Sequence, residues 1–190
     1  MELSKKRFVI YNLIKLGVFI VIDIFIIIFA HDIVANALKY FIGGLMLMYG
    51  MEEILFEAIF AGKHFLHKSK NYLGFVEILL GLLLIVAPFE LSNVFIIWAT
   101  WSILREAFEV KEIVTELKCI TPRVFSGIES LVVIVFSVIF LLDPGEHHAL
   151  IHMYLLCVEL IFFPLTPLMD EWSEVAYYKN KRKEKNEVQE

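Results

Sequence analysis

Pairs of long apolar stretches recur along this chain about every 53 residues, and this repetition constrains its fold more than any other feature. The second stretch of each pair carries a glutamate in its later half, at Glu53, Glu106 and Glu159. A charged side chain at the centre of a membrane helix costs roughly 2.5 to 3.5 kcal/mol on insertion scales. Three recurrences in one register therefore predict three copies of a helical hairpin that together enclose polar side chains.

The apolar content places the chain in a membrane. Hydrophobic residues make up 59% of the 190 residues, with 17 phenylalanines, and the mean hydropathy is +0.73. A helix needs about 20 mostly apolar residues to cross the hydrocarbon core. Six stretches approach that length, and their continuous apolar runs favour helices over membrane strands, which alternate with period two. We expect an all-α membrane protein whose six transmembrane helices cover about 8–30, 35–61, 72–88, 92–115, 122–142 and 148–168.

The positive charges predict the orientation, because lysine and arginine collect in loops that stay in the cytoplasm. The loops at 31–36, 89–92 and 143–147 contain neither residue. The N-terminus, the alternate loops and the tail contain most of them: Lys5, Lys6, Arg7, Lys63, Lys68, Lys70, Lys118, Arg123, Lys179, Lys181, Arg182, Lys183 and Lys185. Both termini are therefore predicted to be cytoplasmic.

The predicted organisation is one transmembrane domain over residues 1–178, followed by a charged tail. The hairpin repeats cover about 8–62, 71–118 and 122–176. Pro164 and Pro167 are expected to break the last helix, since proline removes a backbone donor. The mixed-charge tail 179–190 is expected to be disordered.

A cleaved signal peptide is the alternative interpretation of the first stretch. Basic residues precede it, and Ala35 to Ala37 resembles a small-residue cleavage site. Asn12, Lys15 and Asp23 interrupt the run, which is long for a signal peptide, and its removal would leave an odd number of helices. We therefore favour a retained first helix.

Ionisable residues are predicted at one depth, in the inner half of the membrane, on all six helices. With a rise of 1.5 Å per residue, this set comprises Lys15, Glu53, Glu77, Arg105, Glu106, Glu129 and Glu159. Lys15 and Arg105 are the only cations among them, so some carboxylates should be protonated, hydrated or bound to a cation. Two interpretations stay open: a network that holds the helices together, and a binding site for protons or cations with Glu77, Arg105, Glu129 and Glu159 as its most buried members.

A second polar group is predicted at the outer ends of the helices: His31, Asp32, Asp143, His147, His148 and His152. Histidine beside carboxylates changes charge between roughly pH 5 and 8, so this outer rim could sense external acid. His148 and His152 are one helical turn apart and could share a metal, or the whole rim could be ordinary polar surface. The two cysteines have no metal-ligand spacing, and we expect no bound metal or cofactor.

The repeats share further details. Glycine recurs at Gly17, Gly74 and Gly127, near the start of the first helix of each pair. The segment Gly81 to Pro88 reads GLLLIVAP, and Ile103 to Phe108 reads ILREAF. In these features the chain resembles the HdeD-type acid-resistance membrane proteins, six-helix proteins made of three hairpins. The resemblance implies an inner-membrane protein linked to acid stress and supplies no catalytic residues.

Three functions follow from these observations. The first is a non-enzymatic protein for acid or envelope stress, and the second is a small transporter or channel for protons or another solute. The third, an enzyme on a lipid or quinone, has only buried carboxylates in its favour, because no nucleophile motif or phosphate-binding loop is present. The expected partners are the lipid bilayer and either a second copy of the chain or another membrane protein. Nucleic acid is not expected, since the net charge is −5.

Overall fold

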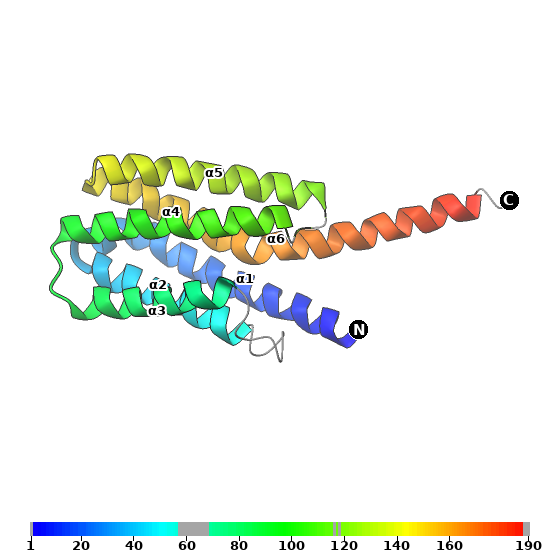
Figure 1. The fold of residues 1–190 in the computed structure, drawn as a ribbon, viewed down its shortest axis with the longest axis horizontal. Coiled ribbons are helices and arrows are strands. Elements are labelled where there is room, and N and C mark those ends of the chain that lie inside the picture. Colours follow the sequence, from blue (N-terminus) through cyan, green and yellow to red (C-terminus); the bar gives the residue numbers. More distant parts are fainter. Residues whose placement is uncertain (1, 57–68, 116, 118, 188–190) are drawn as a thin grey trace.

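The computed structural model describes residues 2–56, 69–115, 117 and 119–187 of the chain. This part is 94% helical and contains no strand, so the predicted all-α class is confirmed. Figure 1 shows its elements in chain order: α1 (Glu2–Asp32), η1 (Ile33–Ala37), α2 (Leu38–Phe56), α3 (Ser69–Val86), α4 (Leu91–Thr115), α5 (Ile120–Leu142) and α6 (Glu146–Glu187). The part of the second predicted helix after residue 56 lies outside the described residues.

Within the part of the chain that the structure describes, three helical stretches are long and apolar enough to cross a membrane: Phe8–Ile54, Ile120–Leu142 and Glu146–Val175. The first contains both α1 and α2, and Figure 1 shows the chain reversing direction between them. A shorter apolar helix covers Tyr72–Val86. A protein with these segments belongs in a membrane.

The reversal between α1 and α2 keeps the backbone in a helical pattern. Residues Ile33–Ala37 form η1, a π-helix, in which each turn is wider than in an α-helix. Ile33 and Val34 are buried there, so the turn itself adds to the core. The other turns at this end are short, with residues 87–90 between α3 and α4 and 143–145 between α5 and α6. We call this the short-loop end of the bundle.

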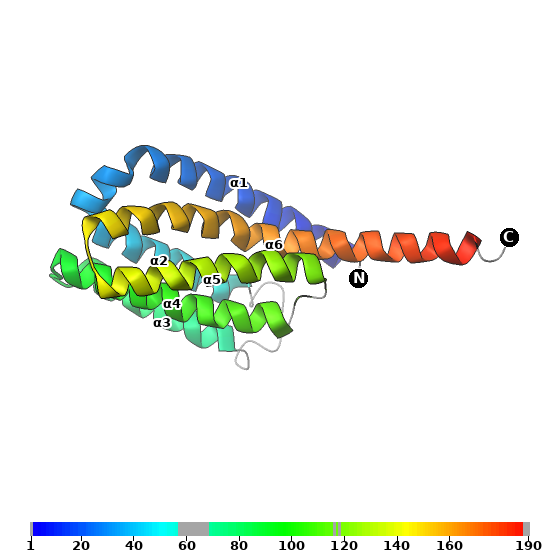
Figure 2. The same cartoon turned by 90° about the horizontal axis from the view of Figure 1, so that it is seen from above.

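The six α-helices of the described residues pack into one bundle. α2 packs closely against α3, α4 against α5, and α6 against both α5 and α1, while α4 also touches α2 and α3. Figures 1 and 2 show the helices running roughly along one axis, with the N- and C-termini at the end opposite the short loops. We call this opposite end the termini end.

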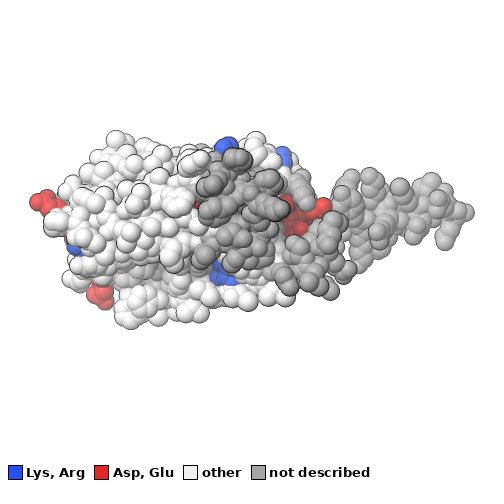
Figure 3. Space-filling view, turned by 60° about the horizontal axis from the view of Figure 1, so that its bottom comes forward, with Lys and Arg blue, Asp and Glu red and all other residues white. Residues whose placement is uncertain are grey.

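Aromatic and aliphatic side chains fill the interior and also cover the outside. Trp98, Tyr49 and Phe140 are the largest of the fully buried side chains. Apolar side chains such as Val21 and Leu131 are more than 60% exposed. The surface in Figure 3 is mostly white, with acidic side chains near the ends of the bundle. An outer surface this apolar matches lipid better than water.

Glycines allow α2 and α3 to approach closely. A Cβ atom placed on Gly81 would lie 2.7 Å from the carbonyl oxygen of Gly43, and one placed on Gly74 would lie 3.0 Å from that of Gly50. Membrane helices use small residues in this way to bring backbones together. These two glycine pairs therefore form a seam between α2 and α3 within a single chain.

Helix α6 corrects two predictions. It continues through Pro164 and Pro167, which were expected to break it, although Figure 1 shows the helix changing direction along its course. Proline is tolerated inside membrane helices because neighbouring groups and local adjustments compensate for the lost hydrogen bond. The helix also extends to Glu187, whereas a disordered tail was predicted from residue 179. Lysine and glutamate, which dominate this tail, are good helix formers.

Candidate functional site

A buried ion pair joins α3 to α4. The Arg105 guanidinium donates to Glu77 Oε1 from Nη1 at 3.1 Å, and the Trp101 indole donates to the same oxygen at 3.0 Å. Glu77 is completely buried and Arg105 is 5% exposed. The guanidinium also lies 3.5 Å above the centre of the Tyr49 ring on α2. The guanidinium of Arg105, on α4, therefore contacts side chains of both α3 and α2.

A second ion pair joins α1 to α2. Lys15 Nζ lies 2.8 Å from Glu52 Oε1, and the Tyr11 hydroxyl donates to this oxygen at 2.9 Å. The sequence pointed to Glu53 as the α2 member of the network, but Glu52 is the residue that pairs with Lys15. Glu53 is half-buried and lies within the electrostatic reach of Arg105.

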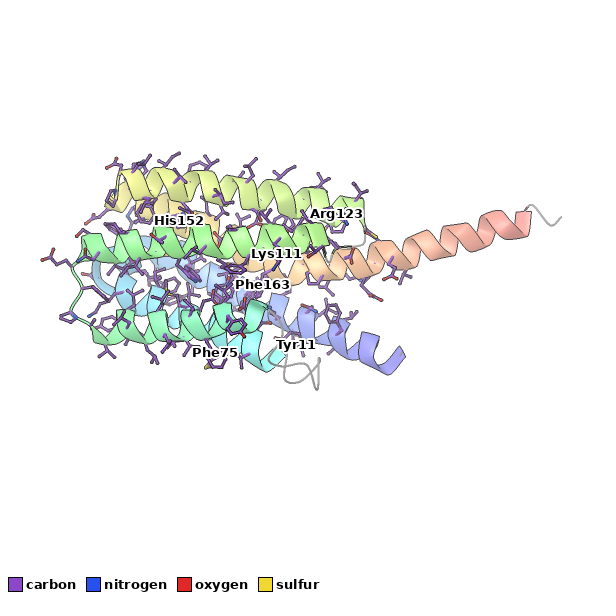
Figure 4. All side chains as sticks on the ribbon, in the orientation of Figure 1. Tyr11, Phe75, Lys111, Arg123, His152 and Phe163 are labelled. Carbon is purple, nitrogen blue, oxygen red and sulfur yellow. The ribbon has the colours of Figure 1, made fainter. Side chains whose placement is uncertain are left out.

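An aromatic cluster separates the two cations. Phe163 of α6 lies near the middle of the bundle in Figure 4, with Lys15 Nζ 3.3 Å and Arg105 Cζ 5.0 Å from its ring centre. The Phe163 ring also contacts Tyr49 edge-on, at 5.4 Å between centres. Ring faces attract cations, and each such contact contributes about 2 kcal/mol when water is excluded. In this part of the site, each cation is therefore paired with a carboxylate and lies close to an aromatic ring. This arrangement is expected of a network that holds helices together.

Three other glutamates lack such balance. Glu106 on α4, Glu129 on α5 and Glu159 on α6 are 1%, 7% and 6% exposed. They are close enough for each to interact electrostatically with the other two. Among the described residues no lysine or arginine forms an ion pair with any of them, and each has one buried oxygen without a hydrogen bond. We call Glu106, Glu129 and Glu159 the carboxyl cluster.

The carboxyl cluster belongs to a longer line of buried polar side chains between α4, α5 and α6. The inward stripe of α5 carries serine at one- and two-turn intervals, and its Ser130 lies beside Glu106. All members are at most 7% exposed. We call this line the polar seam, and it consists of Ser102, Glu106, Ser126, Glu129, Ser130, Ser137, His152 and Glu159.

His152 does not lie on the outer rim, where the sequence placed it. It is 1% exposed, and its Nε2 lies 2.9 Å from the Ser102 hydroxyl inside the bundle. The ring of His152 is enclosed by Trp98 and Phe140, at 4.9 and 5.4 Å between centres. His152 therefore shares no surface with His148 and belongs to the polar seam.

The remaining rim residues are at the short-loop end. His31, Asp32, Asp143 and His147 are exposed there. His148 Nδ1 lies 2.9 Å from the Asp143 carbonyl oxygen and 3.5 Å from its carboxylate. Within the described residues, no three histidine, cysteine, aspartate or glutamate side chains lie close enough together to hold a metal ion.

Asp23 is a buried polar residue that the sequence analysis left out of the network. It is 4% exposed on α1 and lies beside Cys157 of α6. One sequence signal could have found it. Asp23 precedes Glu77 by about one repeat length, and Glu77 precedes Glu129 by a similar distance.

The aromatic partners and the serines were also missed. Trp101, Tyr49, Phe163 and the inward serines of α5 look like ordinary membrane-helix residues until their neighbours are known. Which side of a helix faces the interior depends on packing between helices that are distant in sequence.

The comparisons with known proteins found no match to a family model, a curated protein or a solved structure. The described residues define the class as an all-helical protein, with three stretches among them long and apolar enough to cross a membrane.

Proposed function

We propose that this chain is a non-enzymatic protein of the bacterial inner membrane that takes up protons at its carboxyl cluster, in the context of acid or envelope stress. The HdeD-type sequence pattern supports the physiological part of this proposal. The buried polar residues support the chemical part. Its direct partner is the lipid bilayer. A second copy of the chain or another membrane protein would receive any signal that the protein passes on.

The proposal includes six crossings arranged as three hairpin repeats. The packing supports it, because the second helix of each pair packs against the first helix of the next pair: α2 on α3, α4 on α5, and α6 back on α1. Three equivalent hairpins related by a rotation would close into a ring in the same way. The placement of both termini at one end agrees with an even number of crossings (Figure 1).

The observation that carries the proton-binding function is the contrast between the two halves of the buried network. Glu77 and Glu52 each have a cation within 3.1 Å. The three glutamates of the carboxyl cluster lie close to one another and have no cation in such direct contact among the described residues, while Arg105 acts on all three from farther away. Isolated buried carboxylates are too costly to persist, and they become neutral by binding protons.

Infrared spectroscopy of the protein in liposomes at neutral pH tests this proposal, because a protonated carboxyl group has its own carbonyl band. We expect such a band in the unaltered protein and a clear decrease of it in the triple variant Glu106→Gln, Glu129→Gln, Glu159→Gln, with the remainder coming from Asp23, which is also buried. Glu52→Gln is the matched control, since Glu52 is paired with Lys15 and should contribute no protonated band. A band that is absent, or that is unchanged in the triple variant, would contradict the proposal.

A second candidate function is conduction of protons or another small solute. The polar seam favours it, because the seam continues beyond the carboxyl cluster toward the short-loop end.

A further inference from the structure

The polar seam reaches well beyond the residues that a proton-binding site needs. On α4, Ser102 lies one turn from Glu106 on the side of the short loops, about 6 Å along the axis. On α5, Ser137 lies two turns beyond Ser130, and on α6, His152 lies two turns before Glu159, about 10 Å away in each case. Ser102, Ser137 and His152 are all at most 2% exposed.

Two ring nitrogens at this outer part of the seam are buried without a hydrogen bond. His152 uses Nε2 for its contact with Ser102, and its Nδ1 has no partner in the described chain. The indole Nε1 of Trp98 is buried without a partner as well. Buried polar atoms without partners are uncommon, so two of them in adjacent rings require an explanation.

His152 is enclosed by uncharged side chains of two neighbouring helices. Trp98 and Ser102 of α4 and Phe140 of α5 pack around the ring, and no charged group of the described chain acts on it. Its position is about 9 Å from the start of α6, roughly a third of the way through a membrane. Figure 4 places His152 toward the short-loop end of the bundle.

Serine hydroxyls and imidazole both donate and accept hydrogen bonds, so each can receive a proton on one side and release one on the other. The steps of about 6 to 10 Å along the seam are longer than a hydrogen bond, and water molecules can bridge such steps. Trp98, Phe140 and Val133 are buried beside these groups and make the outer part of the seam narrow and mostly apolar. Apolar constrictions of this kind act as gates in channels.

We propose that the polar seam is a proton path across the membrane, with His152 as its outer relay and the Trp98 and Phe140 rings as its gate. A proton from the outer water binds His152 Nδ1, and the proton on Nε2 passes to the Ser102 hydroxyl and a bridging water. It then reaches the carboxyl cluster, which releases a proton toward Ser126 and the cytoplasmic water. The ring then rotates, which turns Nδ1–H toward Ser102 and the free Nε2 toward the outer side, and the passage of a second proton restores the first tautomer. This path rests on the proton-binding function proposed above.

Proton flux into liposomes tests the path, using the full chain, an enclosed pH-sensitive dye, and a potassium diffusion potential that draws protons inward. The unaltered protein is expected to acidify the interior faster than protein-free liposomes. Ser102→Ala should slow the flux about tenfold, the expected effect of losing one hydrogen bond to a charged group. His152→Leu and Glu129→Gln should abolish it, and Trp98→Ala should increase it several-fold by opening the constriction.

Glu90→Gln is the matched control, because Glu90 is exposed at the short-loop end and outside the seam. Flux equal to that of protein-free liposomes, in both the unaltered protein and Trp98→Ala, would overturn the path. So would unchanged flux in both Ser102→Ala and His152→Leu. If the infrared band of the carboxyl cluster is still present in those liposomes, proton binding stands and only conduction fails. If the band is absent as well, both proposals fail.

Discussion

Replacing Arg105 with alanine is expected to destabilise the protein by about 3 to 5 kcal/mol, because the change leaves the Glu77 carboxylate buried without its partner. Glu77 is completely buried and receives hydrogen bonds from Arg105 and Trp101. The loss also removes the guanidinium from the face of the Tyr49 ring. Chemical unfolding in mild detergent, followed by circular dichroism, measures the change in the free energy of unfolding.

Two further variants identify the cause of this loss. Lys111→Ala removes an exposed cation from the same helix and should change stability by at most about 1 kcal/mol. The double variant Arg105→Met, Glu77→Gln removes both charges and should recover much of the loss, since neutral side chains of similar size often replace a buried pair without penalty. An Arg105→Ala variant as stable as Lys111→Ala would show that the pair is not buried as described.

Replacing Gly81 with leucine is expected to cost about 3 kcal/mol, because the atoms that its side chain would meet include backbone. Even a Cβ atom at this position lies 2.7 Å from the Gly43 carbonyl oxygen and 3.1 Å from the Leu47 nitrogen. The helices α2 and α3 would have to separate along the seam formed by their glycines. The same unfolding measurement detects this loss.

Gly44 offers a matched control on α2, since nothing lies within 4 Å of a Cβ atom placed there. Gly44→Leu should therefore leave stability within about 0.5 kcal/mol of the unaltered protein. Equal effects of Gly81→Leu and Gly44→Leu would mean that α2 and α3 do not approach as closely as the structure shows.

The helical class could be predicted from the sequence because continuous apolar runs carry a strong signal. The starts of α4 and α5 lie within two residues of the predicted bounds, and α5 ends at the predicted residue. The tail was different. Its charged composition suggested disorder, but local helix propensity lets α6 continue to Glu187.

The depth of the polar residues could also be estimated from the sequence, but not their partners. Glu52 and Glu53 are neighbours that point about 100° apart around the helix, so only the position of α1 decides which one meets Lys15. His148 and His152 lie on one face of α6, yet the first is near the surface and the second is covered by Trp98 and Phe140. Such differences come from tertiary packing, which hydrophobic periodicity does not encode.

In the structure, the buried ionisable residues fall into a paired group and an unpaired group among the described residues. Arg105 and Lys15 each form an ion pair with a carboxylate near the aromatic cluster around Phe163. Glu106, Glu129 and Glu159 are buried on α4, α5 and α6. Among the described residues, none of them is paired with a cation. From the sequence alone both interpretations apply to one set of residues, whereas in the structure only part of that set is paired with a cation.

The membrane placement of these carboxyl groups is the central claim, and labelling of single cysteines tests it most directly. In a background with Cys119 and Cys157 replaced by serine, Glu90→Cys and Glu146→Cys report on the short-loop end, and Thr115→Cys reports on the termini end. With a thiol reagent that cannot cross membranes, positions 90 and 146 should react in intact cells, and position 115 only after the membrane is opened. Equal labelling of all three positions in intact cells would contradict the account.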